Sequence, residues 1–295
     1  MKTYLSRLVF VLSAVTLLMT VGCGESAKAR QQRTRAEREE QARQEKAALK
    51  IGVLPTLDCL PLFIAQDDSL FASKGVDVRL RLNGAQIDND TCFVGQHIEG
   101  MVTDKIRAER IARQGMPVMT LAETNAYWLL FANPKSRIHE LSQLGDKMVA
   151  MTRYSVTDHL TDVALKGVKT HGSVFRVQFN DVRLRLKMLE NNEMDALWLP
   201  EPQATKARLM ESPVLYDARK SKVHYGVIVF NQKVMQDARR QRQLKQFVAA
   251  YNAAVDSISK HGVGAYGALI KKYCGSDDKT VKALPNLKFS HITVK

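Results

Sequence analysis

Apolar and polar positions follow patterns that predict a regular succession of strands and helices from residue 49 onward. In residues 76–82, Val and Leu occupy every second position, which is the period of a strand with one buried face. Residues 49–54 form a short apolar run that ends at Pro55. Residues 61–74 begin with Pro and are followed by Gly75, a combination typical of a helix and its end.

The same patterns continue to the end of the chain. Strands are also expected at residues 98–102, 118–122, 127–132, 147–151, 174–179, 196–199, 214–216 and 225–230. Helices are expected at residues 104–114, 157–169, 181–191 and 201–210 and throughout 237–273. Because strands and helices alternate, we predict an α/β protein with mainly parallel sheets flanked by helices and right-handed crossovers. The number of units favours two lobes, with the chain crossing near Phe131 and returning near Lys222.

The N-terminal residues differ from this pattern and predict export. Lys2 and Arg7 precede an apolar stretch that continues to Val21, as in a secretory signal peptide. The stretch is too short for a confident membrane-spanning helix. Thr20 to Cys23 resemble the lipobox of bacterial lipoproteins, which implies a signal peptide over 1–22 and lipidation of Cys23. The alternatives are an ordinary signal peptide or an uncleaved anchor.

The next segment contains no core-forming residues. Residues 24–47 have only Ala as an apolar residue and are rich in Arg, Glu, Gln and Lys. We therefore expect a polar tether over 23–47. In the folded body, 48–131 are expected to form the first part of lobe 1. Lobe 2 would then span 132–221, and 222–295 would return to lobe 1 and add the C-terminal helices.

The net charge does not indicate nucleic-acid binding. The full chain carries +14, and removal of Lys2 and Arg7 with the leader leaves +12. Its basic residues are scattered and are not interleaved with aromatic residues, and an exported protein rarely meets nucleic acid. We interpret the charge as solvated surface that favours anionic lipid headgroups.

Four segments in order resemble one family. They are Lys50–Pro55 with Pro61–Ala65, Leu70–Val78, and Met194–Pro202. Together they resemble type II periplasmic solute-binding proteins of ABC importers, in the branch that binds alkanesulfonates, taurine and thiamine pyrimidine precursors. The resemblance implies two lobes joined by a two-crossover hinge, a small-molecule ligand, an ABC permease as partner, an exported monomer and no cofactor.

Loops that follow strands supply most of the candidate ligand-binding residues. In open α/β sheets, ligands bind beyond the carboxyl ends of strands, where helix N-termini present free N–H groups. Three loops meet this description and contain Thr56 and Asp58, Thr103 and Asp104, and Tyr154 and Ser155. At Thr56, Asp58 and Asp104, helix capping is an equally good interpretation. Thr157 is the expected cap of the helix after Ser155.

Further candidates lie near the expected lobe interface. Glu201 lies between two prolines after a strand and, by the resemblance, lines the cleft. Asn125 precedes the first crossover, and Trp198 is expected in the core. Acidic Asp58, Asp104 and Glu201 would be costly to bury unpaired, so we favour a nitrogen-bearing ligand over a sulfonate.

The cysteines and histidines indicate whether a disulfide, a metal site or catalysis should be expected. Cys59 and Cys92 lie near neighbouring strand ends, so either a disulfide or two thiols is expected there, with Cys274 free. Seven scattered histidines, without a metal-ligand spacing or a nucleophile motif, argue against an enzyme and a metal site. A lipid-anchored sensor or interaction module on the same fold is the alternative to transport, and a thiamine-pyrimidine-type enzyme is less favoured.

Overall fold

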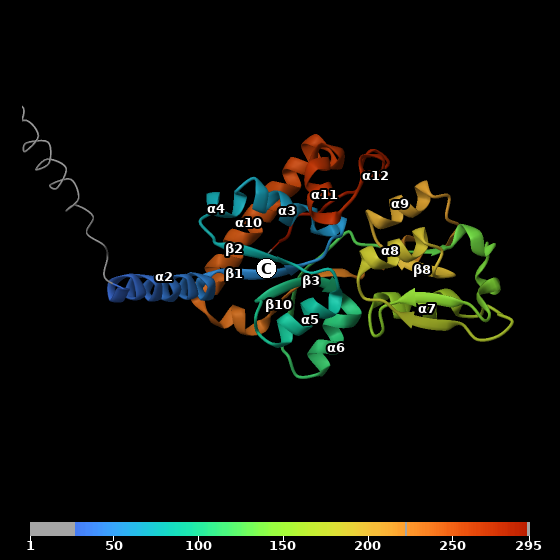
Figure 1. Cartoon of the computed structure of the whole chain (residues 1–295), viewed down its shortest axis with the longest axis horizontal. Helices are drawn as coiled ribbons and strands as arrows, with labels where there is room; N and C mark the ends of the chain where they lie inside the picture. The colour runs from blue at the N-terminus through green and yellow to red at the C-terminus, as the bar shows by residue number, and fades with distance from the viewer. Residues whose placement is uncertain (1–26, 222, 294–295) are drawn as a thin grey trace, which may run out of the picture. The chain divides into compact units, whose positions relative to one another are not determined.

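The computed structural model describes residues 27–221 and 223–293 (Figure 1). The chain separates into two units, Met1–Ala47 and Ala48–Lys295. In the first unit, the described residues form one polar helix, α2 (Ala27–Ala47), where Arg35 pairs with Glu39 one turn later at 3.0 Å. No helix in the described part of the chain is long and apolar enough to cross a membrane. The predicted signal peptide and Cys23 lie outside the described residues.

The second unit contains two sheets with matching topology. In the described residues, the first sheet has the order β2-β1-β3-β10-β4 and the second has the order β7-β6-β8-β5-β9. The first sheet consists of β1 (Leu49–Val53), β2 (Val78–Leu82), β3 (Gly100–Asp104), β4 (Val118–Glu123) and β10 (Gly226–Asn231). The second consists of β5 (Leu129–Ala132), β6 (Met148–Met151), β7 (Phe175–Gln178), β8 (Ala196–Leu199) and β9 (Val214–Asp217).

One strand in each sheet opposes the others. β1 pairs in parallel with β2 and β3, whereas β10 is antiparallel to β3 and to β4. β6 pairs in parallel with β7 and β8, whereas β5 is antiparallel to β8 and β9. The sheets are thus mixed, but their other strands share one direction, as the prediction of mainly parallel sheets requires.

The first passage between the lobes differs from the sequence-based expectation. We assigned residues up to 131 to the first lobe, but β5 pairs with β8 and β9 in the second sheet. The chain therefore leaves the first sheet after Glu123 and joins the second at Leu129, before the expected crossing at Phe131. Periodicity could not assign this strand to a sheet, because both faces of β5 are buried. The return passage runs from β9 to β10 and includes residue 222, which is not described.

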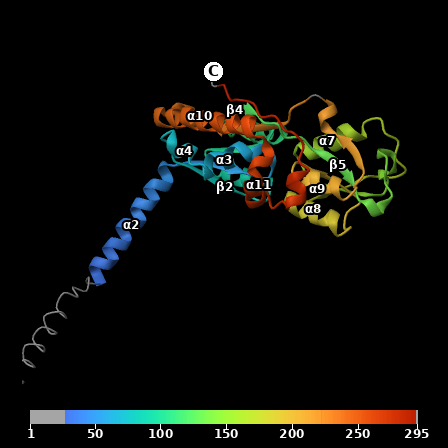
Figure 2. The same cartoon turned by 90° about the horizontal axis from the view of Figure 1, so that it is seen from above.

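Helices cover both faces of each sheet (Figure 1). Those of the first lobe are α3 (Leu60–Asp67), α4 (Leu70–Ser73), α5 (Gln86–Val94), α6 (Lys105–Arg113), α10 (Ala238–His261), α11 (Gly267–Cys274) and α12 (Asp278–Lys282). Those of the second lobe are α7 (Val156–Leu165), α8 (Val182–Glu190) and α9 (Gln203–Leu209). The long helix α10 runs beside α3 and α4 in the view from above (Figure 2), and all three share one hydrophobic core with the sheet.

Alternating side chains divide each lobe into two cores. On β10, Ile228 and Phe230 join the cluster under α3 and α10, whereas Val227 and Val229 join the cluster under α5 and α6. On β8, Trp198 packs toward α7 and Leu197 toward α8. Strands with both faces buried are continuous apolar runs, which explains why the sequence showed them clearly.

Two local predictions were wrong. The helix expected over 61–74 is interrupted at Ser69, whose left-handed backbone (φ 56°) separates α3 from α4. The segment between residues 82 and 98, for which no helix was expected, contains α5. The Gln, Asp and Asn residues of α5 gave a weak helical pattern, and packing of Phe93 into the core decides its conformation.

Candidate functional site

Strand ends of both lobes meet at one small cavity. It is lined from lobe 1 by residues that follow β1, by residues near the end of β3 and by Gln86, and from lobe 2 by Pro200 and by Val182 and Arg185 of α8. Ala126 and Trp128, from the first passage between the lobes, complete the lining. The cavity measures about 20 Å³, which is room for about one water molecule. The lobes are therefore closed on each other in this structure.

Hydrogen bonds cross between the lobes around this cavity. The Gln203 side chain donates to the Pro55 carbonyl at 2.9 Å, and the Leu57 amide donates to the Glu201 carbonyl at 2.9 Å. On another side, Ala85 forms an isolated antiparallel bridge with Asp181. A Cβ on Gly84 would collide with the Asp181 carboxylate, so glycine permits this close approach.

Asp58 is the buried acid of the cavity wall. Its carboxylate accepts hydrogen bonds from the hydroxyls of Thr56 at 2.6 Å and Thr124 at 3.1 Å. Burial raises the pKa of Asp58 above its ordinary value, although both hydroxyls oppose the rise. Neither Thr56 nor Cys59, the residues that precede the short helical turn Leu57–Cys59 and α3, makes a side-chain cap. Helix capping therefore does not account for Thr56 and Asp58.

Thr103 and Asp104 are the last two residues of β3 and have different surroundings. The buried Thr103 hydroxyl lines the cavity and has no hydrogen-bond partner. Asp104 caps α6 by accepting from the Arg107 amide at 2.9 Å, and it also accepts from the lobe 2 amide of Val156 at 3.2 Å. Gln86 donates to its second oxygen at 3.3 Å. Burial raises the pKa of Asp104 to about 6.

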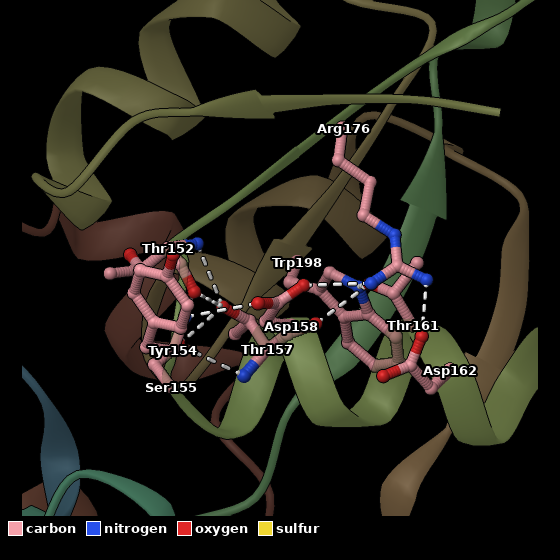
Figure 3. A network of polar contacts seen from close by, with 9 residues as sticks. All are labelled: Thr152, Tyr154, Ser155, Thr157, Asp158, Thr161, Asp162, Arg176 and Trp198. Atoms are coloured by element: carbon pink, nitrogen blue, oxygen red, sulfur yellow. Dashed lines mark hydrogen bonds and ion pairs between the residues drawn. The ribbon is translucent and has the colours of Figure 1, made fainter. Parts of the chain in front are cut away.

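The loop before α7 does not place its side chains as we expected (Figure 3). Tyr154 is 58% exposed and lies under the Arg110 guanidinium of lobe 1 at 4.6 Å, outside the cavity lining. Ser155 is fully buried and caps α7, accepting from the Thr157 amide at 3.2 Å. Both were expected to face the cleft, and Thr157 was expected to be the cap. The left-handed backbone of Tyr154 (φ 57°) turns the chain so that Ser155 takes the capping position.

Glu201 is buried and fully engaged within lobe 2. Its carboxylate accepts from the Tyr127 hydroxyl at 2.7 Å and from the Thr205 amide and hydroxyl, and it pairs with Arg208. This network stabilises the start of α9, and Glu201 is not part of the cavity lining. Asn125 is also outside the lining and donates to the Lys288 carbonyl at 2.9 Å. Trp198 is a core residue, as expected, with its indole N–H on Thr161 at 2.9 Å.

Arg185 and Gln86 line the cavity but were not among the residues expected from the sequence. Arg185 is 1% exposed and donates to the Trp198 carbonyl at 2.8 Å, while its Nε has no partner. Burial lowers its pKa to about 10. In the sequence, Arg185 is one of several basic residues of α8 that resemble a solvated face. The feature of the sequence that indicates its burial is its position between apolar Leu184 and Leu186, close to the buried Met188 and Leu189.

Larger cavities exist elsewhere but lack this convergence. One of about 370 Å³ lies between α8 and α9 of lobe 2 and the α11–α12 region, where Lys206 pairs with Asp277 at 2.6 Å. Another of about 510 Å³ lies between β4 and the C-terminal segment. We place the candidate site in the small cavity because buried acidic, basic and hydroxyl groups from both lobes converge there.

The cysteines do not form the bridge considered from the sequence. Cys59, Cys92 and Cys274 are free thiols. Cys59 lies in the core under α3, whereas Cys92 packs against the core on the opposite face of the sheet. The sheet separates them, so the thiol alternative is correct. In the described part of the chain, no group of three or more His, Cys, Asp and Glu side chains is arranged to hold a metal ion.

Comparison with solved structures identifies the fold. A protein from Bordetella bronchiseptica superposes with a TM-score of 0.68 at 16% identity, over 85% of each chain. The periplasmic aliphatic sulphonate binding protein of Escherichia coli gives 0.64 at 16% identity, over 80% of this chain and 81% of that one. The periplasmic nitrate-binding protein of Synechocystis gives 0.67 at 15% identity, over 79% and 68%.

At these identities the likeness shows a shared fold, the two-lobed fold of periplasmic binding proteins. No protein-family model matches the sequence, and no curated protein matches it.

Proposed function

We propose that this protein is an exported, lipid-anchored solute-binding protein that captures a small molecule between its lobes and delivers it to an ABC importer. The observation that carries the proposal is the cavity itself, in which buried polar groups from both lobes face one small space. The fold neighbours include the binding proteins for aliphatic sulphonate and nitrate named above. The proposal assigns no catalytic residue and no cofactor.

A nitrogen-bearing ligand is supported by Asp58. Its carboxylate is buried on the cavity wall and has two neutral hydroxyls as partners. An ammonium or N–H group of a ligand would supply the opposite charge or a donor that the fold does not provide. Thr56 and Thr124 hold the carboxylate in place, so they are positioning residues for this contact. Thr103 supplies an unpartnered hydroxyl beside it.

A thermal-shift screen of the full chain against a library of small solutes tests the proposal. A solute at about a hundred times its dissociation constant adds about 2.7 kcal/mol to the free energy of unfolding, which a raised melting temperature reports. Asp58→Asn should remove the shift, whereas Asn125→Ala, outside the cavity, should keep it. A screen without a stabilising solute, or a shift unchanged in Asp58→Asn, would contradict the proposed site.

A further inference from the structure

Arg185 is a buried charge without a carboxylate partner among the described residues. It is 1% exposed, its one side-chain hydrogen bond in the described structure goes to the neutral Trp198 carbonyl, and its Nε is unpartnered. Arg107 offers a comparison, because it is equally buried but pairs with Asp90. Asp181 attracts the Arg185 charge, but its carboxylate caps α8 and forms no ion pair with Arg185.

Such a charge is costly to retain. A guanidinium stays protonated at neutral pH, and a buried ion without a partner destabilises the fold relative to a paired one. A guanidinium also presents a planar set of donors that matches the two oxygens of a carboxylate or sulfonate. The position of Arg185 on the cavity wall therefore points to an oxyanion as its partner.

The acidic and basic groups of the cavity belong to different lobes. Asp58 follows β1 in lobe 1 and Arg185 lies on α8 in lobe 2, and they form no ion pair with each other although both line the same space. A ligand with only a positive charge would leave Arg185 buried and unpaired on closure. A ligand with only a negative charge would leave Asp58 without an opposite charge.

We propose that the ligand is a small amphoteric molecule, with an ammonium or N–H group on Asp58 and a carboxylate or sulfonate on Arg185. This inference rests on the proposed function and names the ligand class of that site. Each lobe binds one end, so the ligand itself connects the lobes. Because the closed cavity is smaller than such a molecule, the lobes must part to admit it and close around it less tightly than in this structure.

Calorimetric titration of the full chain with three matched sets of probes tests this inference. The sets are short ω-amino carboxylates and ω-amino sulfonates, alkylamines of the same length, and carboxylates and sulfonates of the same length. We expect binding within the amphoteric set and at least tenfold weaker binding by the probes of a single charge. Equal affinity for amines alone or for anions alone would overturn the inference, as would no binding within the amphoteric set.

Two variants in α8 test whether Arg185 binds the anionic end of the ligand. Arg185→Gln should weaken binding of the best amphoteric probe at least tenfold, and Lys187→Gln, two residues away and exposed on the same helix, should leave it unchanged. Unchanged binding in Arg185→Gln would overturn the assignment even if the protein binds the probe. If the solute screen finds a ligand that is not amphoteric, this inference fails while the proposed function stands. If the screen finds no ligand at all, the proposed function fails.

Discussion

Asp104 shows how one residue can combine the roles of helix cap and contact between lobes. Its carboxylate accepts from the first turn of α6 and from the Val156 amide at the start of α7. Both contacts are to N–H groups at helix N-termini, which favour a negative charge. Burial nevertheless dominates and raises its pKa to about 6. Asp90, paired with Arg107, is the neighbouring carboxylate that adds to this rise.

The raised pKa of Asp104 predicts a distinct pH dependence. The folded protein binds this proton more tightly than the unfolded chain, so the contribution of Asp104 to the free energy of unfolding increases as the pH falls from about 6 toward 4. The size is at most roughly 3 kcal/mol. As the pH falls over this interval, we expect the melting temperature of wild type to rise relative to that of Asp104→Asn. A pH-independent difference would show that Asp104 does not titrate there.

Single residues also mark the limit of sequence-based prediction of the site. Thr56, Asp58 and Thr103 were found because they follow strands, and chain topology brings such positions to one sheet edge. The same rule selected Ser155 and Glu201, whose side-chain polar atoms are used within lobe 2. Only three-dimensional contacts separate these cases. Arg185 was missed because the sequence does not show which face of α8 the other lobe covers.

Among the elements, two segments control how closely the lobes approach. One is the connection between β2 and α5, and the other is the start of α8. Gly84 lies against Asp181 and Arg183, and Ala85 bridges to Asp181. Asp181 also caps α8, accepting from the Arg183 amide at 2.7 Å. A side chain on residue 84 would therefore separate the lobes or displace the capping carboxylate.

Gly84→Val should accordingly weaken solute binding about tenfold, or about 1.4 kcal/mol, because it opposes closure. Calorimetric titration with a ligand from the solute screen measures the effect. Gly264→Ala is the matched control, since a Cβ there would meet no atom within 4 Å. Equal affinity in Gly84→Val and wild type would show that this contact is not part of the ligand-bound state.

The elements themselves were largely predictable, apart from their grouping. Buried strands such as β1 and β8 are apolar runs between turn residues, and both were expected close to their observed bounds. The assignment of β5 to the second sheet was not predictable, because a strand buried on both faces carries no sign of its sheet. The break at Ser69 and the helix α5 likewise depend on packing more than on local pattern.

At the scale of the whole molecule, export and anchoring remain predictions from the N-terminal sequence. If Cys23 is lipidated, Cys23→Ser should move the protein from the membrane fraction to the soluble fraction or block its processing. Stable anchoring requires more than one acyl chain, which the lipid modification of this cysteine would provide. Fractionation with immunoblotting measures the outcome. Unchanged membrane association and size in Cys23→Ser would contradict the lipoprotein assignment.

The matching topology of the two sheets explains why a ligand site forms where the lobes meet. In each sheet one strand, β1 or β6, pairs in parallel with the strand on either side of it. Residues after β1 and at the end of β3 line the cavity from lobe 1, and Pro200, after β8, lines it from lobe 2. The chain passes between the lobes twice, before β5 and before β10. Hinge closure about such passages is a common way to enclose a ligand.

Capture of a solute in this cleft is the central claim, and native mass spectrometry tests it most directly. The full chain would be incubated with a mixture of small cellular solutes, desalted and measured intact beside the double variant Asp58→Asn/Arg185→Gln. The account predicts one bound solute of discrete mass on the wild type and none on the double variant. A wild type without a bound solute, or a double variant that retains the same solute, would contradict it.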